Sequence, residues 1–254
     1  MMMAETIVIK VGGHASASLP QQFYQQLQQW QKEGKHILVI HGGGPQISRW
    51  SDQFGLTVQK QNGIRVTDAQ TLAVTQAVLL GVVQPAICQQ FSQHHLAVVG
   101  LNTSDNHLLS GTYLDQQQYG EVGQITAVNE AWLQTVLAHQ IGILAPLAQT
   151  TDGHLLNVNA DTAAAAIAAK LGANKLVLLT DVPGVLNAGK VVPMLDQAGA
   201  DQLFEQKQIK AGMMPKIKAA FNALHEGVHQ VLITNDLANS GTILHQSKAK
   251  RVAG

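Results

Sequence analysis

The chain has little charge, few aromatic residues and a single cysteine. Only 13% of its 254 residues are charged, and its 16 basic and 16 acidic side chains cancel. Nucleic-acid binding needs a basic face and membrane-surface binding needs a polybasic segment, so this balance favours neither partner. With one cysteine, Cys88, no intramolecular disulfide can form, which is typical of a reducing cytoplasm. No motif surrounds Cys88, and we interpret it as a small buried apolar residue.

Targeting signals and long apolar runs are also lacking. The stretch Met1–Glu5 has neither the charged nor the apolar segment of a signal peptide. No uninterrupted apolar run approaches the ~20 residues that cross a bilayer. We therefore expect a cytoplasmic protein without a membrane partner. Apolar residues make up 46% of the chain, enough for the core of one large domain or of two closely joined lobes.

Short β-branched segments alternate with segments of helical spacing. The strands that we expect are Thr6–Val11, His36–His41, Leu96–Leu101, Ile141–Ala145, Lys175–Thr180 and Val228–Thr234. They are almost continuously apolar, as strands buried on both faces of a parallel sheet are. Helical spacing marks Pro20–Glu33, Asp161–Leu171 and Pro215–Glu226. This alternation predicts an α/β fold with a mainly parallel sheet, and residues 102–126 predict a hairpin or long loop over a site.

A lysine and a glycine triplet follow the first two expected strands. Lys10 precedes Val11-Gly12-Gly13, and His41-Gly42-Gly43-Gly44-Pro45 leads into a helix-like segment. Ligands of open α/β sheets bind beyond the carboxyl ends of strands, and glycines let the backbone approach an anion there. A buried lysine needs an anionic partner or a route to solvent, and we favour a ligand for Lys10. The triplet alone suits a phosphate-binding turn or an ordinary strand–helix turn.

Lys216 follows Pro215 in the first turn of an expected helix. A cation there faces the positive end of the helix dipole, at a cost of roughly 0.3–1 kcal/mol that a nearby anion would reverse. We interpret Lys216 as a second anion-binding residue, although a lysine that reaches into water is the alternative.

Polar residues precede the alanine-rich helix, in Asn157-Val158-Asn159-Ala160-Asp161. Asn159 or Asp161 is expected to cap that helix, but capping leaves the rest of the cluster unexplained. Asn157 suits a substrate carboxylate, and Asp161 suits holding both lysines or meeting Mg²⁺.

Two further turns and one misleading motif complete the candidates. Arg65 follows the Asn62-Gly63 turn and could hold a carboxylate with two nitrogens or lie on the surface. Asp181–Leu186 suits a nucleotide-binding turn or a plain turn. His225-Glu226-Gly227-Val228-His229 matches a zinc pattern that needs both histidines on one helix, but Gly227 is expected to end the helix first.

Together these stretches resemble the amino-acid kinase family. The matching stretches span nearly the whole chain: Ile9–Gly13, Val39–Gly44, Asn62–Thr67, Leu156–Asp161, Leu179–Leu186 and Gly212–Lys216. None is specific alone, but the set is. Asn62–Thr67 and Asn157–Asp161 are similar to the acetylglutamate branch of the family.

The resemblance implies an open three-layer αβα sandwich with a mainly parallel central sheet. Residues 1–173 would form an N-terminal lobe for acetylglutamate binding and dimerisation, and residues 174–254 a C-terminal lobe for ATP. The implied reaction is ATP-dependent phosphorylation of the side-chain carboxylate of N-acetyl-L-glutamate, a step of arginine biosynthesis. Mg²⁺ would arrive with ATP and need no metal site in the protein, and the chain would form a homodimer.

The resemblance also implies residue roles. Lys10 and Lys216 would stabilise the transferring phosphoryl group, and Asp161 would orient both lysines. The implied substrate-binding residues are Gly43, Gly44, Arg65, Asn157 and Asn159. Gly12 and Gly13 would offer backbone N–H groups to phosphate. The nucleotide would lie beside Asp181, Val182, Pro183, Gly184, Val185, Leu186, Gln208, Ile209 and Lys210.

The chain departs from the family pattern in places. Ala211 stands where another glycine is frequent, and Asn102–His107 matches a glycine-richer turn poorly. The first expected strand starts near residue 6, without the preceding helix of arginine-sensitive hexameric members, so we expect a dimer without strong arginine feedback. A kinase for acetylaminoadipate or another acidic amino acid stays an alternative. So does a catalytically silent amino-acid sensor, although retention of Lys10, Asp161 and Lys216 argues against it.

Overall fold

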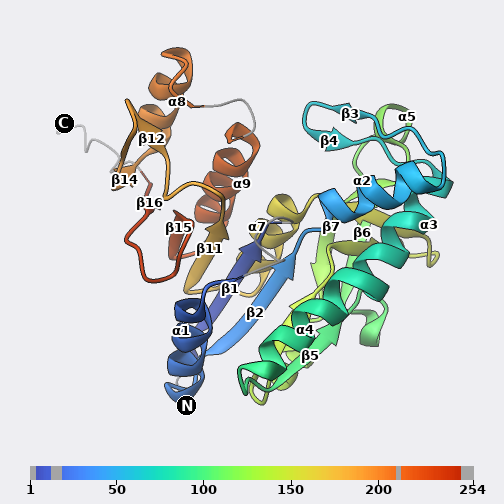
Figure 1. Ribbon diagram of the computed structural model, residues 1–254, viewed down its shortest axis with the longest axis horizontal. Helices are drawn as coiled ribbons and strands as arrows, with labels where there is room; N and C mark the ends of the chain where they lie inside the picture. Colours follow the sequence, from blue (N-terminus) through green and yellow to red (C-terminus); the bar gives the residue numbers. More distant parts are fainter. Residues whose placement is uncertain (1–3, 13–18, 210–212, 247–254) are drawn as a thin grey trace, which may run out of the picture.

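The computed structural model describes residues 4–12, 19–209 and 213–246, and its centre is an eight-stranded sheet (Figure 1). The strand order is β14-β16-β15-β11-β1-β2-β8-β5. The strands are β1 (Thr6–Val11), β2 (His36–His41), β5 (Val98–Leu101), β8 (Ile141–Leu144), β11 (Lys175–Leu179), β14 (Met194–Leu195), β15 (Gln230–Thr234) and β16 (Thr242–Leu244). Neighbours pair in parallel except β15 and β16. All six expected strands are present, and the predicted α/β fold is confirmed.

Side chains of the sheet alternate between two apolar cores. On β1, Val8 belongs to one core and Ile7 and Ile9 to the other. β11 does the same, with Leu176 in the first core and Val177 in the second. Burial on both faces explains why the strand sequences are continuously apolar. It also fixes which face each polar residue of these strands points to.

Helices cover both faces of the sheet. On the face of Ile7 lies α1 (Gln21–Lys32), which buries Phe23, Leu27 and Trp30 in that core. On the other face lie α6 (Glu130–Leu137), α7 (Ala160–Lys170) and α9 (Met214–His225). The helices expected around residues 20–33, 161–171 and 215–226 are therefore confirmed. The alanines of α7 let it pack closely between the sheet and α9.

A closed four-stranded barrel stands beside the main sheet. It contains β6 (Leu109–Tyr113), β7 (Val122–Val128), β9 (Leu147–Gln149) and β10 (Leu155–Val158), in the order β10-β7-β6-β9. Because β6 and β7 pair antiparallel, the hairpin expected within residues 102–126 is confirmed. Two short helices, η3 (Asp105–His107) and α5 (Gln116–Tyr119), lie in the same stretch.

One long helix runs from Ala69 to Gln93 with a π-turn in its middle. It consists of α3 (Ala69–Val78), η2 (Leu79–Val83) and α4 (Gln84–Gln93). The Gln84 side-chain amide, just after the π-turn, donates to Leu101 O at 2.7 Å and Ile143 O at 2.8 Å. The helix is thereby bound to β5 and β8.

The same helix bears on the membrane prediction. Within the described ranges it is long and apolar enough to cross a membrane, with a mean hydropathy of 1.7 over its most apolar 18 residues, of which 44% are buried. Core helices of soluble proteins pass that test too. This helix contains no long uninterrupted apolar run; it reaches that length and hydropathy because its glutamines and threonines carry no charge.

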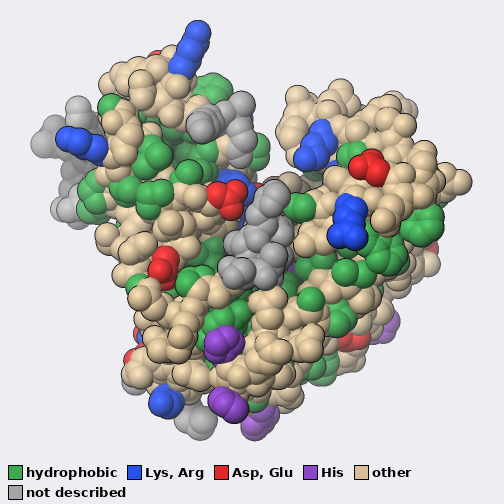
Figure 2. Space-filling view, viewed as in Figure 1, with side chains coloured by type: hydrophobic (Ala, Val, Ile, Leu, Met, Phe, Trp, Pro, Cys, Tyr) green, Lys and Arg blue, Asp and Glu red, His purple; other side chains and the backbone are tan. Residues whose placement is uncertain are grey.

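Two small hairpins and two helices complete the surroundings of the site. The hairpins are β3 (Lys60–Gln61) with β4 (Ile64–Arg65) and β12 (Leu186–Asn187) with β13 (Lys190–Val191). The helices are α2 (Gly44–Gln53) and, farther along, α8 (Gln197–Glu205). In the space-filling view, the surface is hollowed between the part that carries α8 and α9 and the part that carries β3 and β4 (Figure 2).

The order of strands in the sheet relates to the two lobes expected from the sequence. Strands β2, β8 and β5 lie on one side of β1, and β11, β15, β16 and β14 lie on the other. The chain leaves β1 toward β2, and the strands after residue 173 add to the opposite side. The carboxyl end of β1 is therefore a topological switch point, where open α/β sheets bind ligands. Division into lobes at residues 173 and 174 stays a prediction.

Candidate active site

Two lysines meet one carboxylate at the carboxyl end of β1. Lys10 is on the same face of the sheet as Val8, so its side chain points to α7. Its Nζ lies 2.8 Å from Oδ1 of Asp161, as a close ion pair without the alignment of a hydrogen bond. Lys216, from the first turn of α9, donates from Nζ to Asp161 Oδ2 at 2.7 Å. The structure thus joins three residues that are far apart in the chain, as the sequence analysis expected.

Burial affects the pKa values of Lys10 and Asp161 in this trio. Lys10 is 5% exposed and Asp161 is 8% exposed. Desolvation lowers the pKa of Lys10, and the positive charge of Lys216 lowers it further against the attraction of Asp161. Burial alone would raise the pKa of Asp161, but the two lysines outweigh it and hold that pKa below its ordinary value. Two cations and one anion leave a net positive charge, which suits an incoming anion.

The glycine triplet forms the turn from β2 into α2. A Cβ at Gly43 would lie 2.7 Å from Leu79 Cδ2, so the Leu79 side chain of the long helix packs directly on this turn and would have to shift for a larger residue. Nothing lies within 4 Å of a Cβ at Gly44, which leaves open space over the start of α2. The α2 N-terminus has no side-chain cap, so its backbone N–H groups are available to an anion. Gly12 lies across from this turn at the end of β1, and the predicted Gly13 lies outside the described residues.

His41 anchors the turn from inside. It is fully buried, and desolvation lowers its pKa to about 4. Its ring Nδ1 lies 3.2 Å from Gly42 O. The Gly42 N–H in turn donates to Val11 O, which ties the triplet to the end of β1. The imidazole is therefore neutral at pH 7 and serves the geometry of the turn.

Arg65 lies against the start of α2 with one nitrogen unused. Its Nη2 donates to Gly44 O at 3.2 Å and to Ser48 Oγ at 2.9 Å. Its Nη1 is buried and has no hydrogen-bond partner among the residues that the structure describes. Desolvation lowers the pKa of Arg65, partly offset by Asp52. A buried cation held by neutral partners leaves a donor for a ligand carboxylate.

Asn157 is held by residues that the sequence analysis gave no role. Its Nδ2 donates to Thr67 Oγ1 at 3.1 Å. The backbone of Glu121 joins the segment of Thr67 to β10, because its N–H donates to Thr67 O at 2.6 Å and its O accepts from Asn157 N at 2.9 Å. Gly120 next to it has φ +69°, and a Cβ there would lie 2.3 Å from Thr67 O. Ser48 and Thr67 were missed because only their positions in space relate them to Arg65 and Asn157.

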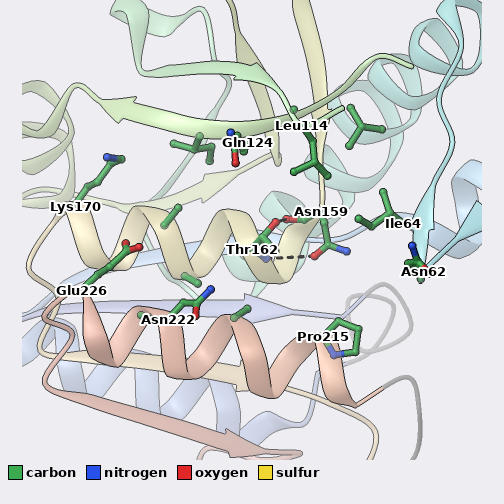
Figure 3. Close-up of a pocket in the computed structure, with 18 residues that line it drawn as sticks. Asn62, Ile64, Leu114, Gln124, Asn159, Thr162, Lys170, Pro215, Asn222 and Glu226 are labelled. Carbon is green, nitrogen blue, oxygen red and sulfur yellow. Dashed lines mark hydrogen bonds between the residues drawn. The ribbon is translucent and has the colours of Figure 1, made fainter. Parts of the chain in front are cut away.

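Asn159 is the cap of α7. Its Oδ1 accepts hydrogen bonds from the N–H groups of Asp161 at 2.9 Å and Thr162 at 3.2 Å. Its side chain also lines a cavity of about 430 Å³ between β7, α7 and α9 (Figure 3). Lys10, Arg65 and Lys216 do not line this cavity.

The predicted nucleotide residues lie in the C-terminal half of the sheet. Asp181 and Pro183 are exposed after β11, Val182 and Leu186 are half-buried, and Gly184 packs against Thr242. The Val185 and Ile209 side chains are in the apolar core, so any nucleotide contact of theirs would come from the backbone. Gln208 Oε1 accepts from Ala188 N at 3.2 Å. Lys210 lies outside the described residues.

The zinc-like motif does not form a zinc site. His225 is the last residue of α9, Gly227 follows with φ +105°, and β15 begins at Gln230. His229 therefore cannot lie on the same helix face. In the described part of the chain, no three His, Cys, Asp or Glu side chains gather as metal ligands.

The fold and the trio define a phosphotransferase of the open α/β class. Two cations on a shared carboxylate, next to a glycine turn at a helix N-terminus, are the groups that phosphoryl transfer requires. Residues 5–235 match the model of the amino acid kinase family. The chain belongs to that family.

Curated relatives match over nearly the whole chain. One, named acetylglutamate kinase, is from Lactiplantibacillus plantarum; it is 50% identical over 97% of this chain and 100% of its own length. Another of that name, from Listeria monocytogenes, is 43% identical over 94% of this chain and 96% of its own.

Solved structures agree on the fold. The crystal structure of smu.665 from Streptococcus mutans UA159 has a TM-score of 0.89 at 36% identity, covering 94% of this chain and 98% of that one. Carbamate kinase from Giardia lamblia bound to AMP-PNP has a TM-score of 0.66 at 16% identity, covering 97% of this chain and 100% of that one. The second likeness bears on the fold alone.

Proposed function

We propose that this chain is an acetylglutamate kinase, which uses ATP to phosphorylate the side-chain carboxylate of N-acetyl-L-glutamate to N-acetyl-L-glutamyl 5-phosphate. The observation that carries the chemistry is Asp161 between Lys10 and Lys216, at 2.8 and 2.7 Å. The choice of substrate is supported by relatives of that name at 40–50% identity. We place the reaction in arginine biosynthesis in the cytoplasm.

The reaction needs no general base in this proposal. A carboxylate is ionised at pH 7, so its oxygen attacks the γ-phosphorus directly. The new O–P bond forms as the bond to the β-phosphate oxygen breaks, and ADP leaves with that electron pair. The protein has to bring two anions into line and neutralise them. Lys10 and Lys216 would donate to the transferring phosphoryl oxygens, while Asp161 fixes where both ammonium groups point.

Substrate recognition would lie on the N-terminal side of the site. Arg65 Nη1, buried and without a partner in the described ranges, would take the substrate's α-carboxylate. Asn157, held by Thr67, would donate to the same region, and Asn159 would border it. Gly43 and Gly44, with Gly12 and Gly13, would supply backbone N–H groups around the reacting carboxylate and the phosphate.

ATP would lie over the carboxyl ends of β11 and β15, next to the turn Asp181–Leu186 and residues 208–210. Mg²⁺ bound to the nucleotide would supply neutralisation of the phosphate charges. Asp161 is the acidic residue of the trio, and its oxygens already face two lysines. We therefore propose that Mg²⁺ enters on ATP without a dedicated set of protein ligands.

The test is ATP turnover with Mg²⁺ and hydroxylamine, which traps an acyl phosphate as a hydroxamate. N-acetyl-L-glutamate is compared with glutamate, aspartate and acetylaminoadipate. We expect hydroxamate selectively with N-acetyl-L-glutamate. Selectivity for another acid would keep the mechanism and refute the substrate. No hydroxamate with any acid, from protein shown to be folded, would refute the kinase and favour a sensor.

We also propose a homodimer. The helix from Ala69 to Gln93 carries no charged side chain, and less than half of its most apolar 18-residue stretch is buried within the chain. An uncharged, partly exposed helix of this length suits burial against a second copy. Sedimentation equilibrium should give twice the chain's 27.1 kDa. A monomer at micromolar concentration would contradict the proposal.

A further inference from the structure

The cavity of about 430 Å³ beside α7 has features that the proposed reaction does not use. Its walls are β7, the outer sides of α7 and α9, and the tip of the β3–β4 hairpin (Figure 3). Thr162 faces the cavity, whereas its neighbour Asp161 faces the two lysines. The cavity therefore starts next to the reaction site and runs away from it along α7. Its volume is within the ~300–1,000 Å³ range of small-molecule sites.

The middle of the cavity, between Thr162 and Lys170 along α7, is apolar. The residues that line it here are alanines of α7 and α9 and an isoleucine of β7: Ala165, Ala166, Ala219, Ala223 and Ile125. Alanines at these positions leave room that larger side chains would fill. Such a surface suits an aliphatic group and offers it no hydrogen bonds.

The end away from the reaction site carries two opposite charges. Lys170 is the last residue of α7, and Glu226 directly follows α9. Both line the cavity and lie at the same end of it (Figure 3). Neither side chain makes an ion pair or a hydrogen bond with another residue of the described ranges. Asn222, one turn before Glu226 on α9, also lines the cavity with its amide side chain (Figure 3).

We propose that this cavity binds a free α-amino acid with an aliphatic side chain. Its carboxylate would pair with Lys170, its ammonium group with Glu226, and its side chain would lie on Ala166 and Ala223. A simple anion would meet repulsion from Glu226, and a simple cation would meet repulsion from Lys170. A zwitterion can pair with both charges at once, and the alanines next to Lys170 and Glu226 favour an aliphatic side chain.

Size supports this choice. From Thr162 to Lys170, α7 rises about 12 Å. An amino acid such as leucine would fill the charged half of that length and leave the end at Asn159 free. The site is therefore distinct from the one that would hold the acyl amino acid.

The test is isothermal titration of the full chain with L-leucine, L-isoleucine and L-methionine, without nucleotide. N-acetyl-L-leucine lacks the ammonium group and serves as the chemical control. Lys170→Met and Glu226→Gln remove the two charges, and Ala166→Leu fills the space without changing charge. Lys218→Met is the matched control, because Lys218 is exposed on α9 and does not line the cavity.

We expect saturable binding of at least one of the three amino acids. The affinity of each cavity variant for the amino acid should be at least about tenfold lower, and so should the affinity of the unaltered chain for N-acetyl-L-leucine. The affinity for the amino acid should stay unchanged in Lys218→Met and in the presence of N-acetyl-L-glutamate. The proposal is wrong if none of the three binds at about 10 mM. It is also wrong if N-acetyl-L-glutamate displaces the amino acid competitively, or if Lys170→Met and Glu226→Gln, shown by circular dichroism to be folded, bind as the unaltered chain does.

Discussion

Replacing Asp161 by Asn tests the electrostatic design of the site. The change keeps the size of the side chain but leaves Lys10 and Lys216 without their shared anion, and Lys10 is 5% exposed. Removing one partner from a buried ion pair costs about 3–5 kcal/mol. For a chain of this length that corresponds to a fall in Tm of roughly 10 °C.

The same substitution should affect turnover. Without Asp161 the two ammonium groups repel each other and lose the positions set at 2.8 and 2.7 Å. A displacement of about 1 Å at a reacting group costs about a hundredfold in rate. We expect kcat to fall by that factor, with a smaller change in KM.

The assays are thermal unfolding and hydroxamate formation. Asp68→Asn is the matched control, because Asp68 is an exposed cap of α3 and Asn caps a helix as well as Asp does. It makes the same change in charge away from the trio. The reasoning is refuted if Asp161→Asn and Asp68→Asn agree within about 2 °C in Tm and about threefold in kcat.

Three further predictions follow from the neighbouring contacts. Arg65→Ala should raise KM for the acyl amino acid at least about tenfold, with a smaller effect on kcat. Ser48→Ala should raise KM more weakly, because it removes only one hydrogen-bond partner of Arg65. An unchanged KM for Arg65→Ala in steady-state kinetics would contradict the role of Arg65. In urea unfolding, Gly120→Ala should destabilise the chain by about 2 kcal/mol more than Gly34→Ala. Both positions have positive φ, but only at Gly120 would a Cβ meet a backbone atom, at 2.3 Å. Equal losses of unfolding free energy in the two variants would argue against the clash. The pKa of His41 falls from 6.5 to about 4 on folding, so the unfolded chain binds more protons between these pH values. The free energy of unfolding should therefore decline by up to about 3 kcal/mol as pH falls from 6.5 to 4. Urea unfolding should show that His41→Asn lacks this part of the decline, and an equal pH dependence of the two proteins would refute the prediction.

Much of the main sheet was predictable, because strands buried on both faces leave a continuous apolar signal. The meeting of Lys10 and Lys216 at Asp161 was predictable as well, since each was an unusual residue for its local position. A lysine at the end of a buried strand and another at a helix N-terminus both called for an anion.

The barrel and the long helix were not predicted, for different physical reasons. β9 has only three residues, and although β10 follows it directly, its other partner β6 is distant in the chain, so little local pattern marks it. In the long helix, the π-turn at Leu79–Val83 breaks the 3.6-residue period on which the prediction depends. The roles of Ser48 and Thr67 could not be predicted, because each accepts a hydrogen bond from another functional side chain, and such a role leaves no pattern in the sequence.

The π-turn makes the length of that helix as important as its composition. At the start of the turn, Leu79 packs where Gly43 has no side chain. Directly after the turn, the Gln84 side chain donates to carbonyls of two strands. Loss of one residue, such as the exposed Gly81, would let α3 and α4 continue as one α-helix and rotate one against the other by about 100°. Only one of the two contacts could then be kept. Along this segment, insertions and deletions should be far less acceptable in evolution than changes of side chain, and an alignment gap placed here would misassign a whole face of the helix.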